Sequence, residues 1–408
     1  MPDAKRVAVT GIGVVSSVGT GWRAYWDAII GGRSGISPVE SVDTTLHFTR
    51  NGGEVKGFSP EQFLPAEIVA TSGRASLLAL SAAHLSYEDA GLSETAFDRS
   101  RAATCIGATY GPIQAIERVN DELLAGRFPS RDLLAQLPPN SASALVSRHF
   151  GLLGPSLMLA SACAAGNYAI GCGYDLIRAG RADIVLCGAA DPFSRIAFTG
   201  FNQLSAVSPD VCRPFDLNRK GMLVAEGAAV LVLEGLSHAL QRGAAVYAEI
   251  AGYGLSCDAH HMTMPSPDGI AECMRAALGS AGITADDVDY VCAHGTGTAA
   301  NDRNECAAIR SVFGERASRI PVSSVKSMLG HAMGAASALE AAACVLAARY
   351  DIVPPTMNFE TRDPDCGIDC VPNTARRTPV RFALNNSYAF GGNNASVVIA
   401  KYQEREGC

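Results

Sequence analysis

Charged residues, tryptophan and long apolar runs are all scarce in this sequence. Of its 408 residues, 18% are charged and two are tryptophan, while 48% are hydrophobic, so the chain can bury a large core. No uninterrupted apolar run approaches the roughly 20 residues of a membrane span. The formal net charge of -7 gives nucleic-acid binding little electrostatic support. We therefore expect neither a membrane nor a nucleic-acid partner.

A secretion signal, a disulfide framework and a metal-ligand pattern are also missing. The opening residues, MPDAKRVAVTGIGVV, enter a strand pattern almost at once and have no signal-peptide architecture. The 13 cysteines are an odd number, so we expect a reducing, cytoplasmic location and mostly inert core thiols. Cys366 and Cys370 lack a second Cys/His pair, and His260 and His261 are adjacent in a loop-like segment. We expect no metal site.

No Pro/Ser-rich linker or low-complexity tract divides the chain. Continuous apolar runs such as RVAVTGIGVV, DIVLCGAA and GAAVLVLEG are typical of buried strands. Helix-like segments such as RASLLALSAAHLSYEDAGL alternate with them. This alternation predicts an α/β protein whose sheets are covered on both faces.

The sequence contains a weak internal repeat. The segments SLMLASACAAGNYAIGCGYDLIRAGRADIVL and PVSSVKSMLGHAMGAASALEAAACVLAARYDIVP share the order strand, small-residue turn, small-residue helix. Cys163 and His331 stand at corresponding places in the two copies. We therefore predict two related halves, residues 1–245 and 246–408, packed into one unit.

Cys163 stands where an apolar strand passes into a helix rich in glycine and alanine. At a helix N-terminus the sulfur would meet unsatisfied N–H groups and the positive end of the helix dipole, which favours the nucleophilic thiolate. The same N–H groups could hold the oxyanion formed when a thioester is attacked. A small buried cysteine at a helix start explains this segment equally well when it is taken by itself.

A second group of candidates follows the strand-like segment DYVCA. His294 ends that strand, at the edge where sites gather in open α/β sheets, although a hydrogen-bonded structural histidine is the competing interpretation. Asp302 and Glu305 begin the next helix, where carboxylates stabilise the positive end of the dipole. Helix capping is sufficient to explain Asp302 and explains Glu305 less clearly.

Lys326 and His331 stand in and just after a turn, ahead of an alanine-rich helix that carries Glu340. An unpaired carboxylate in such an apolar helix is expensive, and a Lys326–Glu340 pair would resolve both charges. Such a pair is equally consistent with a purely structural role.

The segment NNSYAFGGNNAS contains the paired glycines Gly391 and Gly392. They indicate a tight or mobile loop, and Phe390 beside them could gate a pocket. A strand pair joined by an ordinary glycine turn is the alternative.

In this order, these motifs resemble one family, the elongating β-ketoacyl-[acyl carrier protein] synthases of the thiolase-like superfamily. SACAAG is similar to the nucleophile segment, HGTGT to the first histidine motif and VKSMLGHAMGAA to the lysine and second histidine motif. NSYAFGGNNAS resembles the gating loop and RPFDLNRKGMLVAEGAAVLVLE the central signature. The resemblance spans residues 5–400 and implies a thiolase-like fold, with two duplicated halves in a five-layer α-β-α-β-α arrangement.

The resemblance also implies which side chains act. The catalytic set would be Cys163, His294, His331 and Lys326, and the N–H groups of Cys163 and Phe390 would form an oxyanion hole. Supporting carboxylates would be Glu340, Asp302 and Glu305. The residues expected at the pantetheine arm and the pocket gate are Thr296, Thr298, Phe201, Phe390, Gly391 and Gly392. No metal or free organic cofactor is implied.

The implied reaction is a decarboxylative Claisen condensation. An acyl group held on Cys163 would join malonyl-acyl carrier protein and give β-ketoacyl-acyl carrier protein. The implied partners are an acyl carrier protein and a second subunit, in a homodimer or in a heterodimer with a chain-length-factor-like chain. Arg74, Arg127 and Arg131 are candidates for carrier docking, with a solvated surface role as the alternative for each.

Several positions depart from the family's commonest pattern. Ala389 stands where glycine is usual, Asn393 where threonine is frequent, and RKGM replaces Arg-Asp-Gly-Phe. The segment between Phe201 and Arg213 is short. These features favour a specialised polyketide, polyene or aryl-polyene pathway over housekeeping fatty-acid elongation, which stays as an alternative. A non-catalytic chain-length-factor-like subunit is a second alternative, but such relatives usually lack the nucleophile.

Overall fold

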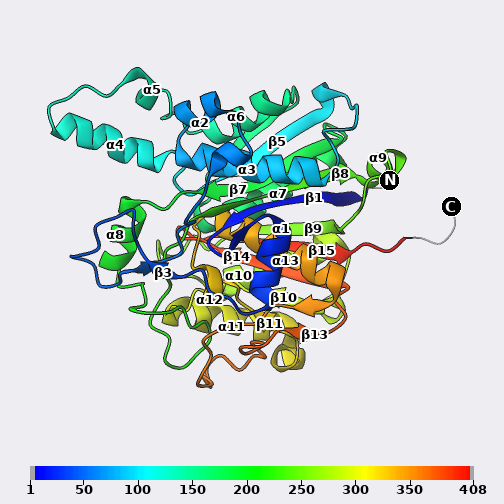
Figure 1. Cartoon of the computed structure of the whole chain (residues 1–408). Helices are drawn as coiled ribbons and strands as arrows, with labels where there is room; N and C mark the ends of the chain where they lie inside the picture. The colour runs from blue at the N-terminus through cyan, green and yellow to red at the C-terminus, as the bar shows by residue number, and fades with distance from the viewer. Residues whose placement is uncertain (1–4, 405–408) are drawn as a thin grey trace.

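Five strands of the N-terminal half form one set in the computed structural model, which describes residues 5–404 (Figure 1). Their order is β6-β5-β7-β8-β1, in which β5 runs parallel to β6 and β7, and β8 runs antiparallel to β7 and β1. These strands are β1 (Val7–Ser16), β5 (Ala102–Gly107), β6 (Ser156–Leu159), β7 (Ile184–Asp191) and β8 (Gly227–Gly235). The helices of this half are α1 (Trp22–Ile30), α2 (Ala66–Thr71), α3 (Arg74–Asp89), α4 (Ile113–Leu124), α5 (Arg131–Leu134), α6 (Ser141–Phe150), α7 (Ala165–Arg178), α8 (Arg195–Gln203) and α9 (Leu236–Gln241). Two-residue strands are β2 (Gly19–Thr20), β3 (Ser37–Pro38) and β4 (Asn51–Gly52).

The C-terminal half repeats this arrangement. Its strand order is β11-β10-β14-β15-β9, with β10 parallel to β11 and β14, and β15 antiparallel to β14 and β9. These strands are β9 (Ala248–Cys257), β10 (Tyr290–Cys292), β11 (Val322–Ser323), β14 (Phe382–Tyr388) and β15 (Asn393–Lys401). The helices are α10 (Pro267–Ala281), α11 (Ala299–Phe313), α12 (Lys326–Leu329) and α13 (Ala335–Tyr350), and a small ribbon pairs β12 (Ile352–Val353) with β13 (Arg376–Arg377).

The matching strand order confirms the internal repeat predicted from the sequence. In each half the third strand along the chain, β6 or β11, leads into a central helix, α7 or α13, and Cys163 and His331 precede those two helices. The halves are joined where β1 pairs antiparallel with β9, which makes one continuous sheet with eleven strands. Residue 245 lies between α9 and β9.

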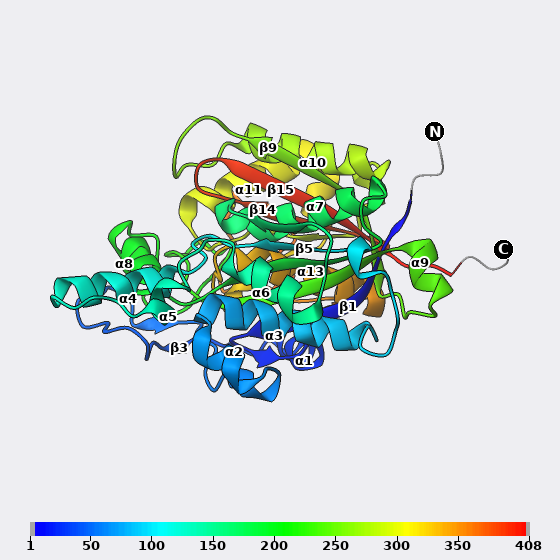
Figure 2. The same ribbon diagram turned by 90° about the horizontal axis from the view of Figure 1, so that it is seen from above.

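The helices and strands form the five layers that the resemblance implies. α3 and α6 cover the outer face of one half, and α10 and α11 cover the outer face of the other. α7 and α13 lie between them and contact strands of both halves, while Figure 2 shows α10 and α3 on opposite outer faces. Because β1, β7 and β8 are buried along their whole length, their sequences are continuously apolar rather than alternating.

Close approach of α7 to α13 explains a glycine in the helix that follows Cys163. A Cβ on Gly166 would lie 2.6 Å from the backbone nitrogen of Ala338, and the Gly166 N–H donates to Gly334 O (3.2 Å). A glycine inside a helix costs about 1 kcal/mol relative to alanine. Here that loss is offset because the two central helices can bring Cys163 and His331 together.

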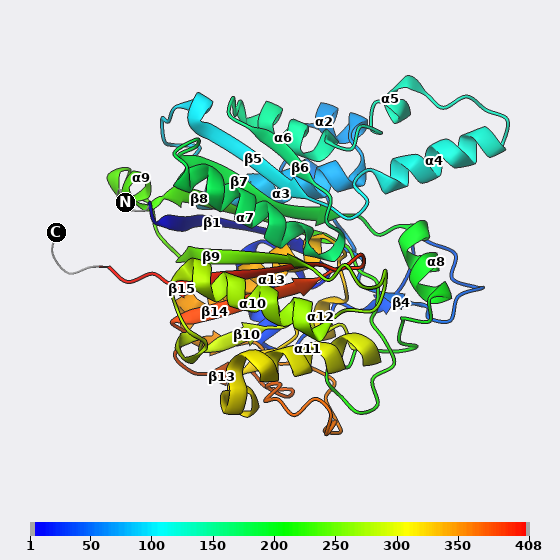
Figure 3. The same cartoon turned by 180° about the vertical axis from the view of Figure 1, so that it is seen from behind.

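One end of the molecule presents apolar side chains to solvent. α4 and α5 project from the body at the end opposite the two chain termini (Figures 1 and 3). On and beside this arm, Leu124 is 80% and Phe128 is 96% exposed. The neighbouring edge strand β6 has Leu157 partly exposed and no strand on its outer side within the described residues. Between residues 5 and 404, no helix has the length and apolar character needed to cross a membrane.

Candidate active site

Cys163 lies in a 3₁₀ turn, Ala162–Ala164, that leads directly into α7. The preceding residue, Ala162, has a φ of 46°, in the left-handed region that non-glycine residues seldom adopt. Burial raises the pKa of the Cys163 thiol to about 12, although Lys326 and the Cys163 N–H oppose that rise. Burial therefore acts against the thiolate that the helix N-terminus is expected to favour. Attack requires a base.

His294 is held in place through its own backbone. The Glu305 carboxylate accepts hydrogen bonds from the N–H groups of His294 and Gly295, both at 2.8 Å. Asp302 accepts from Gly297 N–H (3.1 Å) in the same loop and from the more distant Phe215 N–H (2.8 Å). Burial raises the pKa of Glu305 to about 7 and also raises the pKa of Asp302. Both carboxylates therefore do more than stabilise the start of α11, because they fix the loop that carries His294.

Lys326 forms the predicted buried pair with Glu340, and each side chain is 1% exposed. The ammonium also donates to the His294 carbonyl (2.7 Å) and lies 3.4 Å from His294 Nδ1. Because an ammonium can only donate, Nδ1 is the acceptor and the His294 ring carries its proton on Nε2. Burial raises the pKa of Glu340 to about 7, opposed by Lys326. The pair thus fixes the histidine tautomer.

His331 lies just before α13, the central helix of the C-terminal half, and faces the same cavity as His294. Its N–H donates to Leu223 O (2.7 Å), and its carbonyl accepts from Ala225 N–H (2.9 Å). The two imidazole rings pack edge to face with centroids 5.4 Å apart. Burial, followed by the charge of Lys326, lowers the pKa of both histidines well below the usual value. Both rings are therefore neutral near pH 7 and can each donate or accept a proton.

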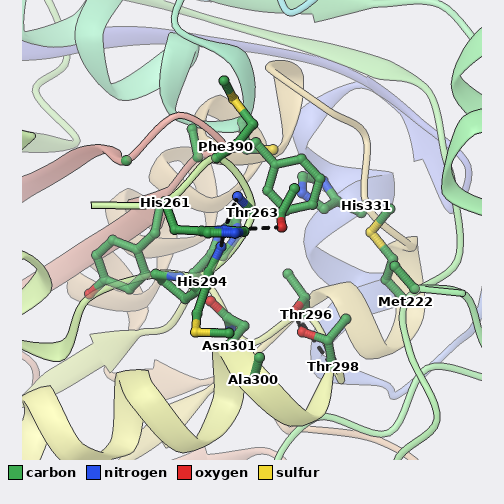
Figure 4. A pocket seen from close by; sticks show the side chains of 18 of the residues that line it. Met222, His261, Thr263, His294, Thr296, Thr298, Ala300, Asn301, His331 and Phe390 are labelled. Atoms are coloured by element: carbon green, nitrogen blue, oxygen red, sulfur yellow. Dashed lines mark hydrogen bonds between the residues drawn. The ribbon is translucent and has the colours of Figure 1, made fainter. Parts of the chain in front are cut away.

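Cys163, His294 and His331 line a pocket that opens to solvent (Figure 4). The Thr296 and Thr298 hydroxyls are hydrogen bonded to one another at 2.9 Å in its wall. Phe201 and Phe390 lie ring against ring, with centroids 5.8 Å apart, and both line the pocket. The residues predicted at the pantetheine arm and the gate thus lie around one cavity with Cys163 in its wall, except Gly391, which is outside the lining.

The gating loop depends on two glycines. Gly391 and Gly392 have φ values of 84° and 81°, and a Cβ on Gly392 would lie 2.8 Å from the Cβ of Asp258. Phe390, just before them, is 39% exposed. Within residues 5–404, neither the Phe390 N–H nor the Cys163 N–H has a hydrogen-bond acceptor. Both N–H groups are thus available to a ligand.

The sequence did not predict the role of the segment 258–265, of which residues 261–265 line one wall of the pocket. The Met262 carbonyl accepts a hydrogen bond from Gly391 N–H (2.8 Å), and the Asp258 N–H donates to Gly392 O (2.9 Å). His261 Nδ1 accepts from the N–H groups of Thr263 and Met264, both at 3.1 Å. A signal in the sequence could have revealed this wall: Met262 and Met264 stand in a polar, loop-like stretch, where no core is expected to bury them.

The three arginines considered for carrier docking lie outside the pocket lining. Arg74 forms a bidentate pair with the buried Glu226 (2.7 and 2.6 Å), so its guanidinium is engaged inside the N-terminal half. Arg127 is exposed and bonded to Glu122, and Arg131 is exposed at the start of α5. The structure assigns Arg74 to an internal ion pair, whereas docking by Arg127 and Arg131 stays a prediction.

A nucleophile and two histidines delivered by duplicated halves define a condensing enzyme of the thiolase-like class. Residues 4–239 match the family model "Beta-ketoacyl synthase, N-terminal domain", and residues 247–360 match "Beta-ketoacyl synthase, C-terminal domain". The chain belongs to the β-ketoacyl synthase family, whose members are condensing acyltransferases.

Known proteins resemble the chain over nearly its whole length. Nodulation protein E of Rhizobium meliloti (strain 1021) is 41% identical over 396 residues, which cover 96% of this chain and 98% of that protein. The solved ishigamide ketosynthase/chain length factor is 43% identical, with a TM-score of 0.94, over 98% of this chain and 100% of that one. A chain of the solved complex of a type II polyketide acyl-carrier protein with its ketosynthase is 34% identical, with a TM-score of 0.90, over 98% of this chain and 100% of that one.

Proposed function

We propose that this protein transfers an acyl group to Cys163 and condenses it with malonyl-acyl carrier protein, with loss of carbon dioxide, to give β-ketoacyl-acyl carrier protein. The observation that carries this proposal is the convergence of Cys163, His294 and His331 on one buried pocket, with Lys326 behind His294. A chain that serves only as a non-catalytic subunit has no need of this complete set.

In the first half-reaction a neutral histidine of the pocket takes the thiol proton of Cys163. The thiolate attacks the carbonyl carbon of an acyl thioester on the pantetheine arm of the carrier. The N–H groups of Cys163 and Phe390, which have no backbone acceptor among residues 5–404, donate to the resulting oxyanion. The C–S bond to pantetheine then breaks, the carrier thiol leaves with a proton, and the acyl group remains on Cys163.

In the second half-reaction malonyl carrier enters, and its C–C bond to the carboxylate breaks. Carbon dioxide leaves, and the electron pair forms an enolate whose charge rests on the thioester oxygen. His294 donates from Nε2 and His331 from its protonated nitrogen to that oxygen. The enolate carbon attacks the acyl group on Cys163, and the collapse of the adduct frees the sulfur. No step needs a metal or an organic cofactor.

The proposed substrates are carried by an acyl carrier protein in a polyketide- or polyene-type pathway. This choice is supported by the likeness to a solved ketosynthase/chain length factor and to a ketosynthase bound by its carrier protein. The uncovered edge of β6 and the apolar arm of α4 and α5 offer a surface for a second subunit, either another copy or a chain-length-factor-like chain. Housekeeping fatty-acid elongation is the competing pathway. We place the protein in the cytoplasm, in keeping with the free thiols of the 12 described cysteines.

Acyl transfer to Cys163 tests this function. The protein is incubated with acyl carrier proteins that bear saturated, polyenoic and β-keto chains, and the adduct is mapped by peptide mass spectrometry. We expect the acyl mass on the peptide that contains Cys163 and none in Cys163→Ala. The folded protein remaining unmodified by every chain would rule out the enzyme, whereas a preference for saturated chains would favour fatty-acid elongation.

A further inference from the structure

The first turn of the nucleophile's helix is anchored by the C-terminal half of the chain. Asn167 lies in the first turn of α7, where the N–H groups have no acceptor inside the helix, and its N–H donates to Ser337 Oγ at 3.2 Å. The Cys163 carbonyl accepts a hydrogen bond from Ser387 Oγ at 2.9 Å. Both hydroxyls lie more than 160 residues further along the sequence, so this turn takes its conformation from contacts between the halves.

No side chain next to this turn in the sequence caps it. Ser161 precedes it at the N-cap position, but its side chain makes no capping bond, and its buried Oγ has no partner among residues 5–404. Ala162 holds a left-handed conformation, which is strained for a residue other than glycine and persists only where the surroundings impose it. Ser387, from β14, ties this turn to the C-terminal half by donating to the Cys163 carbonyl.

Ser387 also connects the two segments that carry the oxyanion-hole N–H groups. It is fully buried and stands three residues before Phe390, and it holds the carbonyl of Cys163 itself. Within the described chain no other hydrogen bond joins residues 162–164 to residues 386–392. This hydrogen bond therefore links the segment that carries the Cys163 N–H to the strand that leads to the Phe390 N–H, alongside the packing of Cys163 and Ala164 against Ala389.

From these contacts we infer that Ser387 is a positioning residue that sets the geometry of the oxyanion hole. The inference rests on the proposed function. Without the hydroxyl, a buried carbonyl loses its donor and the strained turn relaxes, so the Cys163 N–H moves out of register with the Phe390 N–H. Transfer of an acyl group, which develops charge on a carbonyl oxygen, is slowed. Alkylation of the same sulfur by iodoacetamide, in which no such charge develops, is not.

Two rates at Cys163 test this role in the full-length protein. Acylation by hexanoyl-pantetheine and alkylation by iodoacetamide are followed by peptide mass spectrometry in wild type, Ser387→Ala and Ser387→Thr. Ser396→Ala is the matched control, because Ser396 is equally buried on the adjacent strand and its hydroxyl donates to Asn386 Oδ1 (2.7 Å), away from Cys163. Thermal unfolding of each variant reports its folded state.

We expect acylation of Ser387→Ala to slow by about 10–100-fold, less than the loss of an oxyanion donor itself causes, with alkylation within about twofold of wild type. Ser387→Thr regains fast acylation, and Ser396→Ala keeps both rates. If the alanine variant does not fold, Ser387→Thr and Ser387→Val give the same comparison, since they differ by hydroxyl against methyl. Equal acylation of Ser387→Ala and wild type, or a parallel fall of both rates, would overturn the inference alone. No acylation of wild type would overturn the proposed function as well.

Discussion

Replacing Lys326 by methionine isolates the electrostatic part of the site. Glu340 then stays in the core without a cation, and its pKa, already raised from 4.5 to about 7 by burial, rises further. The carboxyl must be protonated in the folded protein. At pH 8 the variant holds this proton about 3.5 pH units above the unfolded-state pKa, against about 2.5 units in wild type, so at about 1.4 kcal/mol per unit the linked loss of stability relative to wild type is about 1.4 kcal/mol. Breaking one side of a buried ion pair typically costs about 3–5 kcal/mol.

The sign of the pH dependence follows from the raised pKa of Glu340. Because the folded protein binds the proton more tightly than the unfolded chain, stability falls as pH rises from 4.5 to the folded-state pKa. In wild type that window ends near pH 7, whereas in Lys326→Met it continues upward. The difference between the two proteins therefore widens by about 1.4 kcal/mol per pH unit above pH 7.

Thermal unfolding between pH 7 and pH 9 measures this difference. With 408 residues and about 2.1 cal/mol/K of unfolding entropy per residue, the loss of about 3–5 kcal/mol from breaking the buried pair corresponds to a Tm lower by about 4–6 °C. Lys326→Met/Glu340→Leu should regain the Tm. It should still condense about 100-fold more slowly, because His294 has lost the donor to Nδ1. A Tm gap that stays constant with pH, or wild-type condensation by the double variant, would refute the reasoning.

Four further outcomes follow from the same geometry. His294→Ala should keep acylation of Cys163 but lose malonyl decarboxylation, measured as carbon dioxide release; unchanged release would exclude His294 from enolate stabilisation. Because burial raises the pKa of Cys163 to about 12, its alkylation by iodoacetamide should climb about tenfold per pH unit from pH 7 to 9, and a plateau below pH 8 would show a resting thiolate. Gly166→Ala should lower the Tm and slow acylation, since its Cβ would meet the Ala338 nitrogen at 2.6 Å. The control Gly279→Ala, which has open space around the new Cβ, should stabilise the protein by about 0.5–1 kcal/mol. Similar effects of the two substitutions would contradict the close packing of α7 and α13. EDTA should leave condensation unchanged, and a loss restored by a metal ion would contradict the metal-free chemistry.

The sequence was sufficient to predict the repeat and to select side chains that the structure brings together around one pocket. Buried strands appear as continuous apolar runs, and the two copies of strand, turn and small-residue helix gave the correspondence of Cys163 with His331. The Lys326–Glu340 pair followed from the expense of a lone carboxylate in an apolar helix. Each of these predictions rests on a residue type that is unusual for its surroundings.

Features that depend on contacts between distant segments could not be predicted. The protonation of Cys163 is decided by the depth of its burial, which the helix-start pattern does not report. Ser387 and Met262 are ordinary residue types in a strand and a loop, and their roles arise only when β14 and the segment 258–265 meet the nucleophile and the gate. Arg74 was considered a surface cation because its partner, Glu226, lies 152 positions away.

Reconstituted condensation tests the central claim most directly. The protein, with any subunit that copurifies, is mixed with acyl carrier protein charged with the acyl chain that best modifies Cys163 and with malonyl carrier protein, and intact-mass spectrometry follows both carriers. We predict a carrier that bears the acyl chain extended as a β-ketoacyl group, formed together with one carbon dioxide, from wild type and not from Cys163→Ala. Extension at an equal rate by Cys163→Ala, or an acylated Cys163 that never yields an extended carrier, would contradict this account.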